Sequence, residues 1–199
     1  MEKSDITLYL GGTSSGKSRR AEEHVQKEAE GPVLYVATAR KFPDDAAMME
    51  RIRRHCQRRP AHWATFECPL HLGKMLPSRI DDLVSASPSS ASQRNDAMPT
   101  VLIDCVTMWI TNILMEQVNP GNLSPFLDAV QSETEDLIAL MQQRHCRWVL
   151  VSGETGLGGI AQNTLGRTFC DGLGLANQLL AEQADNAYLV VAGRLLKLS

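Results

Sequence analysis

The chain has 199 residues, of which 43% are hydrophobic and 22% charged, as expected for a globular protein with a sizeable core. Its formal net charge is only −3, so electrostatics gives no reason to expect a nucleic acid as a partner. No run of about 18 apolar residues indicates a membrane span, and the first residues lead into a predicted strand and not into a signal peptide. We therefore expect a protein of the cytoplasm.

The first predicted elements are a strand, a loop and a helix. The strand at 6–10 (ITLYL) is apolar and rich in residues that favour β-structure, whereas 19–25 contains no helix breaker. Between them, GGTSSGKS fits G-x-x-x-x-G-K-[ST], the pattern of the phosphate-binding P-loop. A loop that merely turns the chain would not require this pattern between a strand and a helix. The predicted nucleotide-binding residues are Gly11, Gly12, Thr13, Ser14, Ser15, Gly16, Lys17 and Ser18.

Lys17 and Ser18 end this loop and have the side chains that phosphate chemistry needs. The ammonium group of Lys17 is predicted to reach the β- and γ-phosphates and to act in phosphoryl transfer. The hydroxyl group of Ser18 is predicted to hold Mg²⁺. We therefore predict Lys17 as a catalytic residue and Mg²⁺ as the cofactor.

A second strand and a basic helix follow. The strand is predicted at 33–38, and Asp44-Asp45 is predicted to cap a helix that continues toward Gln57. This helix ends in a dense basic stretch, made up of Arg51, Arg53, Arg54, His55, Arg58 and Arg59. A short strand at 63–67 and a proline-interrupted helix at 71–85 come next. The small polar residues of 85–99 predict a flexible surface loop.

Asp104 ends the next predicted strand, at 100–104. In a P-loop protein, a carboxylate at the end of such a strand can organise Mg²⁺ or its water ligands. Alternatively, Asp104 caps the helix that follows it. The strand pattern alone does not decide between these two interpretations, although the P-loop upstream favours the metal site.

The remaining elements alternate between helix and strand. They are helices at 106–116 and 125–144, a strand at 148–152, a glycine-containing loop at 153–159, a helix at 165–182, and strands at 187–192 and 195–198. This alternation predicts one RecA-like P-loop α/β domain across 1–199, with a mostly parallel sheet and helices on both faces. Such sheets bind ligands at the carboxyl ends of their strands, where the P-loop, 37–39, Asp104 and the loop after Ser152 all fall.

The five cysteines are predicted to be reduced thiols. They are Cys56, Cys68, Cys105, Cys146 and Cys170. Their number is odd and their spacing contains no C-x-x-C pair, so we expect neither a disulfide framework nor a zinc site.

Five segments together carry a resemblance to a known family. They are GGTSSGKS, YVATAR, RIRRHCQRRPAHW with ATFEC, VLIDCVTMWITNIL, and NQLLAEQADNAYLVVAG. The second half of the basic helix is the most specific, because no general folding rule requires R-I-x-x-H-x-x-x-R-P-x-H-W. With these segments the chain resembles the bifunctional adenosylcobinamide kinase / adenosylcobinamide-phosphate guanylyltransferase family nearly end to end, and 85–99 is left as an insertion.

The resemblance implies two activities. One phosphorylates adenosylcobinamide with GTP or ATP, and the other transfers GMP from GTP to adenosylcobinamide phosphate through a covalent guanylyl-histidine. By its position in the motif, His55 is implied to be that histidine. The resemblance also implies a small symmetric oligomer, with a trimer as the expected form. It further implies nucleotide contacts from Ala37, Thr38, Ala39, Cys56, Gln57, Arg58, Arg59, Glu67 and Asp104.

Three positions depart from the family pattern. Residues 56–59 read Cys-Gln-Arg-Arg where Lys-Asp-Gly-Arg is frequent, Asp104 replaces a longer Glu, and Gly153-Glu154 replaces Asn-Glu. These changes concern guanine recognition and corrinoid binding, and they leave the predicted nucleophile and the P-loop in place.

The chemistry of His55 fits the residues around it. A neutral imidazole can attack a phosphorus atom and later leave, and neighbouring arginines can offset charge that develops on the phosphates. From the residues alone, however, a histidine at this position more often belongs simply to the solvated end of a basic helix. Two other functions therefore stay open: a P-loop kinase of another small molecule with His55 idle, and a nucleotide-binding regulator without transfer activity.

Overall fold

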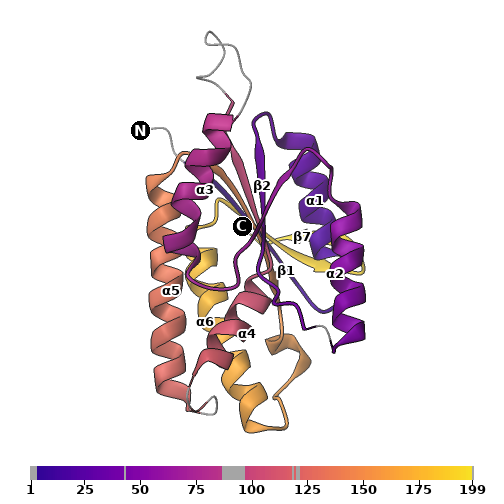
Figure 1. The fold of residues 1–199 in the computed structure, drawn as a ribbon. Helices are drawn as coiled ribbons and strands as arrows, with labels where there is room; N and C mark the ends of the chain where they lie inside the picture. Colours follow the sequence, from indigo (N-terminus) through magenta and orange to yellow (C-terminus); the bar gives the residue numbers. More distant parts are fainter. Residues whose placement is uncertain (1–3, 43, 87–96, 118, 120–121, 199) are drawn as a thin grey trace.

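The computed structural model describes residues 4–42, 44–86, 97–117, 119 and 122–198 (Figure 1). Its strands are β1 (Asp5–Gly11), β2 (Val33–Ala37), β3 (Ala64–Glu67), β4 (Thr100–Asp104), β5 (Arg147–Gly153), β6 (Asn186–Val191) and β7 (Arg194–Lys197). Its helices are α1 (Lys17–Glu28), α2 (Ala46–Arg58), α3 (Leu72–Ala86), α4 (Val106–Glu116), α5 (Leu123–Gln143) and α6 (Thr164–Gln183), with a short 3-10 turn at Gly156–Gly158.

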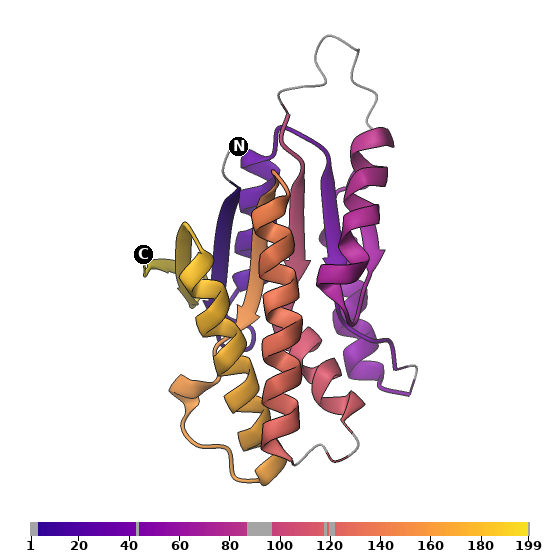
Figure 2. The ribbon, with the colours of Figure 1, turned by 90° about the vertical axis from the view of Figure 1, so that its left-hand side faces the viewer.

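All seven strands form one sheet in the order β3-β2-β4-β5-β1-β6-β7. Every neighbouring pair is parallel except β6 and β7, which are antiparallel. Figures 1 and 2 show α1 and α2 on one face of the sheet and α3, α4, α5 and α6 on the other. The predicted fold class, a mostly parallel sheet with helices on both faces, is confirmed.

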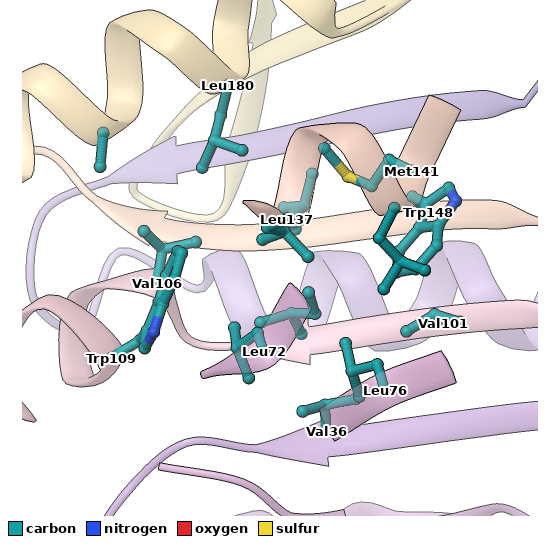
Figure 3. Close-up of a cluster of buried hydrophobic side chains, with 14 of the residues drawn as sticks. Val36, Leu72, Leu76, Val101, Val106, Trp109, Leu137, Met141, Trp148 and Leu180 are labelled. Carbon is teal, nitrogen blue, oxygen red and sulfur yellow. The ribbon is translucent and has the colours of Figure 1, made fainter. Parts of the chain in front are cut away.

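The strands are buried because helices cover both faces, which explains their continuous apolar sequences. The larger core cluster lies between the sheet and α3–α6, and Figure 3 shows its centre around Trp109, Leu137 and Trp148. The smaller cluster joins the opposite face of the sheet to α1 through residues such as Tyr9 and Val25. In contrast, α2 contributes no buried residue and no member of either cluster.

The strand order decides where the loops meet. The P-loop strand β1 and the strand of Asp104, β4, are not neighbours, because β5 lies between them. Their carboxyl ends nevertheless lie close to each other along the sheet: Val151 of β5 is paired with Asp104 on one side and with Tyr9, two residues before Gly11, on the other. The predicted nucleotide-binding segments therefore gather at one edge of the sheet.

Two local predictions need correction. The surface loop predicted at 85–99 begins too early, because Ser85 and Ala86 are the last residues of α3, and 87–96 lies outside the described residues. The helix before it is not interrupted, since Pro77 lies inside α3. In the parts of the chain that the structure describes, no helix is long and apolar enough to cross a membrane.

Candidate active site

The turn between β6 and β7 packs against the P-loop and supports it. Gly16 is the N-cap of α1 and has a φ of 97°, a left-handed conformation that favours glycine. A Cβ atom at Gly16 would meet the Cα atom of Gly193 at 3.3 Å. The backbone N–H of Gly193 donates to the carbonyl oxygen of Ser15 at 2.8 Å, and Arg20 Nε donates to the carbonyl oxygen of Gly193 at 2.8 Å. The turn at Gly193 thus fixes the shape of the loop.

Lys17 lies over its own loop, and its Nζ atom donates to the carbonyl oxygen of Gly12 at 3.1 Å. Burial lowers the pKa of Lys17 and the charge of Arg51 lowers it further, while Cys105 and Asp104 act in the opposite direction. A partly desolvated ammonium group interacts strongly with anions. Phosphate oxygens in the loop would therefore be favourable partners in place of the Gly12 carbonyl.

The side chain of Asp104 contacts residues from three other elements, α1, β2 and α2. Its side chain is only 5% exposed, and its Oδ1 atom accepts a hydrogen bond from Ser18 Oγ of the P-loop at 3.0 Å. Its Oδ2 atom accepts from the hydroxyl group of Tyr35 and lies 3.1 Å from Nδ1 of His55. Burial by itself raises the pKa of the Asp104 carboxyl, but the interactions with His55 and the hydrogen bonds from Tyr35 and Ser18 outweigh it and leave the pKa lowered. Asp104 is therefore held as a carboxylate.

The hydrogen bond to Asp104 orients the ring of His55. An ionised carboxylate only accepts hydrogen bonds, so we assign the proton of the imidazole to Nδ1. Nε2 then carries the free lone pair. The side chain of His55 is 26% exposed, so the ring can be reached from the cavity beside it.

A cavity of about 940 Å³ lies at this edge of the sheet. The predicted site residues that line it are Gly11, Thr13, Ser14, Ser15, Gly16, Lys17, Ser18, Ala37, Ala39, His55, Cys56, Arg58, Arg59, Glu67 and Asp104. Among the other predicted residues, Gln57 is exposed on α2, and Gly12 faces Lys17 with its carbonyl oxygen. Thr38 is buried, where its hydroxyl group donates to the carbonyl oxygen of Cys105 at 2.7 Å and accepts from the backbone N–H of Cys105 at 2.9 Å.

Sequence reasoning missed two residues of the site. Tyr35 lines the cavity, and Glu22 lies beside it, close to His55 and Asp104. Tyr35 is two residues before Ala37 on β2, so strand periodicity could have placed both on one side. Glu22 is four residues after Ser18, one turn further along the same face of α1. It accepts from Arg58 Nε at 3.1 Å and is nearly inaccessible to solvent. Glu154 and Thr155 of the β5–α6 connection also line the cavity. The sequence placed both in a glycine-containing loop, and Glu154 also at a position of the family pattern, but neither was predicted as a site residue.

The hydroxyl oxygen of Ser18 and the carboxylate oxygen of Asp104 lie 3.0 Å apart. Oxygen atoms of these types are the ligands that Mg²⁺ prefers, and Mg²⁺ is bound through few protein ligands when substrate phosphates supply the others. The residues present therefore fit the predicted Mg²⁺.

A phosphate-binding loop between β1 and α1, with a carboxylate from β4 bonded to its last serine, defines a P-loop nucleotide-binding protein of the RecA-like type. Within this class the particular family is also clear. The chain matches the family described as cobinamide kinase / cobinamide phosphate guanyltransferase over residues 7–198, and it belongs to that family. The family predicted from the sequence motifs is confirmed.

Relatives cover almost the whole chain. It is 36% identical over 193 residues to the bifunctional adenosylcobalamin biosynthesis protein CobU of Salmonella typhimurium, a match that covers 94% of this chain and 96% of that protein. It is 37% identical over 186 residues to the bifunctional adenosylcobalamin biosynthesis protein CobP of Pseudomonas aeruginosa, covering 94% and 92% of the two chains. The protein CobU of Escherichia coli K12 is 34% identical over 193 residues, covering 94% and 96%.

Proposed function

We infer that this chain carries both activities for which its family is named, and that its substrate is adenosylcobinamide. The observation that carries the inference is the position of His55 inside the P-loop cavity. Asp104 interacts with His55 through one carboxylate oxygen, at 3.1 Å, and with Ser18 of the P-loop through the other, at 3.0 Å. A nucleophile and a phosphate-binding loop therefore share one carboxylate, an arrangement that suits attack on a bound nucleoside triphosphate.

In the kinase step, the hydroxyl oxygen of adenosylcobinamide attacks the γ-phosphorus of GTP or ATP. A P–O bond to the substrate forms, the P–O bond to the β-phosphate breaks, and the nucleoside diphosphate leaves with the electron pair. The hydroxyl proton passes to water. Lys17 offsets the negative charge on the β- and γ-phosphates as the bond breaks.

In the guanylyl-transfer step, Nε2 of His55 attacks the α-phosphorus of GTP. A P–N bond forms, and pyrophosphate leaves with the electrons of the broken P–O bond. A phosphate oxygen of adenosylcobinamide phosphate then attacks the same phosphorus, the P–N bond breaks, and adenosylcobinamide-GDP is released. Asp104 accepts the hydrogen bond from Nδ1 and stabilises the positive charge on the ring while the P–N bond exists.

Ser18 and Asp104 are proposed to hold Mg²⁺, which when bound neutralises charge on the phosphates of the nucleotide. Alternatively, Asp104 contacts the guanine. An Asp104→Asn variant separates these roles: the first predicts that more Mg²⁺ is needed for activity, and the second predicts a weaker preference for GTP over ATP. If neither changes, Asp104 acts only as the partner of His55 and Ser18. The alternative that Asp104 caps the next helix is wrong, because the N-cap of α4 is Cys105 and no side chain caps that helix.

The test of the proposed function is incubation with GTP labelled at the α-phosphate. Stable labelling of the protein, followed by transfer of the label to cobinamide phosphate, is the expected result. A phosphoramidate on histidine is labile to acid and stable to mild base, unlike a serine ester, and peptide mapping should place it at His55. Label on Lys17 or any other residue would refute the assignment.

The same experiment separates the two other functions. Transfer of the γ-phosphate without protein labelling would indicate a small-molecule kinase in which His55 is idle. Nucleotide binding without turnover would indicate a regulator. GTP or ATP as the phosphoryl donor and a trimeric assembly are proposals that follow from the family resemblance, and sedimentation in solution tests the trimer. A cytoplasmic location, expected from the sequence pattern, is likewise a proposal.

A further inference from the structure

The helix that carries His55 is attached to the domain mainly through polar contacts. No residue of α2 is buried, although the helix has 13 residues. Two side chains of its last turns reach across to other elements: His55 interacts with Asp104 at 3.1 Å, and Arg58 donates to Glu22. The position of His55 therefore depends on these contacts more than on a hydrophobic interface.

Glu22 is an unusual partner for such a contact, because it is 4% exposed in the middle of α1. Arg58 donates to both of its oxygens, from Nε to Oε2 at 3.1 Å and from one terminal nitrogen to Oε1 at 3.4 Å. Burial raises the pKa of the Glu22 carboxyl and outweighs the hydrogen bond and charge of Arg58, which act to lower it. A buried carboxylate without its cation is unfavourable, so Glu22 draws Arg58, and with it α2, toward α1.

The spacing along α2 links this contact to the nucleophile. His55 and Arg58 are three residues apart, so they lie on the same face of the helix. One side-chain atom each from Glu22, His55 and Asp104 lie within 4.8 Å of one another. A rotation of α2 that released Arg58 would therefore also move the imidazole ring away from the P-loop.

The next residue strengthens the same end of the helix. The guanidinium group of Arg59, the C-cap of α2, lies 3.6 Å above the ring of Tyr35, which in turn stacks on Trp63. The N-terminal turns of α2 have no equivalent attachment among the interactions described for residues 46–50. The helix is thus anchored at the end that carries His55.

We propose that Glu22 is a positioning residue for guanylyl transfer, which acts by docking Arg58 and the C-terminal end of α2 so that His55 faces the P-loop. The proposal rests on the proposed role of His55. Phosphoryl transfer from the γ-position uses the P-loop and Lys17 and requires no nucleophile from α2. Loss of the Glu22 charge therefore affects the two activities unequally.

The test compares Glu22→Gln, which keeps the size of the side chain and removes its charge, with Glu23→Gln on the same helix. Glu23 is a matched control because it is half exposed and pairs with Arg20 within α1. In Glu22→Gln we expect covalent labelling by α-labelled GTP to slow about tenfold or more, the effect of losing one charge-assisted hydrogen bond. The rate of γ-phosphoryl transfer should change less than about threefold. Glu23→Gln should leave both rates near those of the original protein.

A second measurement does not depend on activity. Hydrogen exchange of the backbone amides of 46–58 should accelerate in Glu22→Gln, while exchange in α1 and β1 stays the same. A double-mutant cycle with Arg58→Gln should show non-additive effects: the two changes together should accelerate exchange over 46–58 no more than either change alone.

The outcomes separate this proposal from the proposed function. Absence of labelling in the original protein would refute guanylyl transfer, while the exchange data would still report whether Glu22 docks α2. Equal loss of both activities with a lower melting temperature would show that Glu22 only stabilises the fold, and would overturn the proposal. Unchanged exchange over 46–58 would overturn it as well.

Discussion

The two halves of the candidate active site are built in opposite ways. The segment from β1 through the P-loop to α1 rests on the core: Leu8 is fully buried, and α1 contributes Ala21 and Val25 to a buried cluster. The helix α2, which carries His55, contributes nothing to either core cluster. The phosphate-binding half is therefore rigid by packing, whereas the proposed nucleophile is positioned by a few charged and polar contacts.

This difference suits the two reactions proposed for the site. Phosphoryl transfer needs a fixed phosphate cradle and an approaching hydroxyl group. Guanylyl transfer needs a nucleophile that approaches one phosphorus atom, carries the GMP group and then presents it to a second substrate. A helix that is attached at one end and contributes no buried residue can adjust between these positions at low energetic cost. The following predictions test this contrast, starting with the largest effect.

Removal of the proposed nucleophile should abolish one activity and spare the other. In His55→Ala, covalent labelling and guanylyl transfer should fall by about 10⁴-fold or more, as for loss of an essential nucleophile. Kinase activity should remain measurable, because phosphoryl transfer goes directly to the substrate. His62→Ala is the control, since His62 is exposed on the segment that follows α2. Parallel assays of both steps check this prediction, and equal loss of both would contradict it.

Removal of the P-loop lysine should damage both activities together. In Lys17→Ala, we expect both rates to fall by about 10²- to 10³-fold, the usual effect of losing a charged group that stabilises the transition state. The free energy of unfolding should change by less than about 1 kcal/mol, because the side chain faces the cavity. Lys27→Ala is the control, because Lys27 is exposed in the last turn of the same helix. Near-normal turnover in Lys17→Ala would refute the P-loop assignment.

Truncation of one apolar side chain in each half should separate their stabilities. Leu8→Ala in β1 should lower the free energy of unfolding by about 2–5 kcal/mol, because it leaves a cavity in the core. Met49→Ala in α2, where no residue is buried, should change it by no more than about 0.5 kcal/mol. Chemical denaturation measures both values. A large loss in Met49→Ala would show that α2 is packed and not merely tethered.

The smallest effect concerns the hydrogen bond that the hydroxyl group of Tyr35 donates to Asp104. Burial and the charge of Asp104 raise the pKa of Tyr35 well above its ordinary value, so the group stays protonated and acts as a donor. In Tyr35→Phe, Asp104 loses one of the hydrogen bonds that lower its pKa, so this pKa should rise. The carboxylate then becomes protonated at a higher pH, and the acidic limb of the guanylyl-transfer profile should move upward.

Near neutral pH, Tyr35→Phe should change the rate by less than about threefold. The pH dependence of stability should shift in the same direction as the pH dependence of the rate. Because the pKa of Asp104 is lowered in the folded state, its ionised form stabilises the fold above the ordinary pKa of an aspartate, and this contribution is lost as the pH falls through the lowered value. In Tyr35→Phe the loss should begin at a higher pH. A pH profile of rate and of unfolding free energy, with an unchanged acidic limb, would contradict the role of Tyr35.

The sequence by itself determined the parts of the site that are local. The P-loop could be predicted because its glycines, Lys17 and Ser18 follow one another in a fixed pattern between a strand and a helix. The strand that ends in Asp104 could be predicted from its apolar run, and the family from the motif around His55. Each of these signals is contained in fewer than about 20 consecutive residues, the length over which periodicity can be read.

Only the tertiary structure decided how these parts meet. The sequence did not indicate that β5 lies between β1 and β4, nor that the turn at Gly193 supports the P-loop. It did not indicate that α2 stays outside the core, because its apolar residues Met48, Met49 and Ile52 follow the spacing of a packed helix. The contacts between Glu22 and Arg58, and between His55 and Asp104, join residues 36 and 49 positions apart. Such contacts depend on the order and register of strands, which are set by the packing of the whole sheet and not by any one segment.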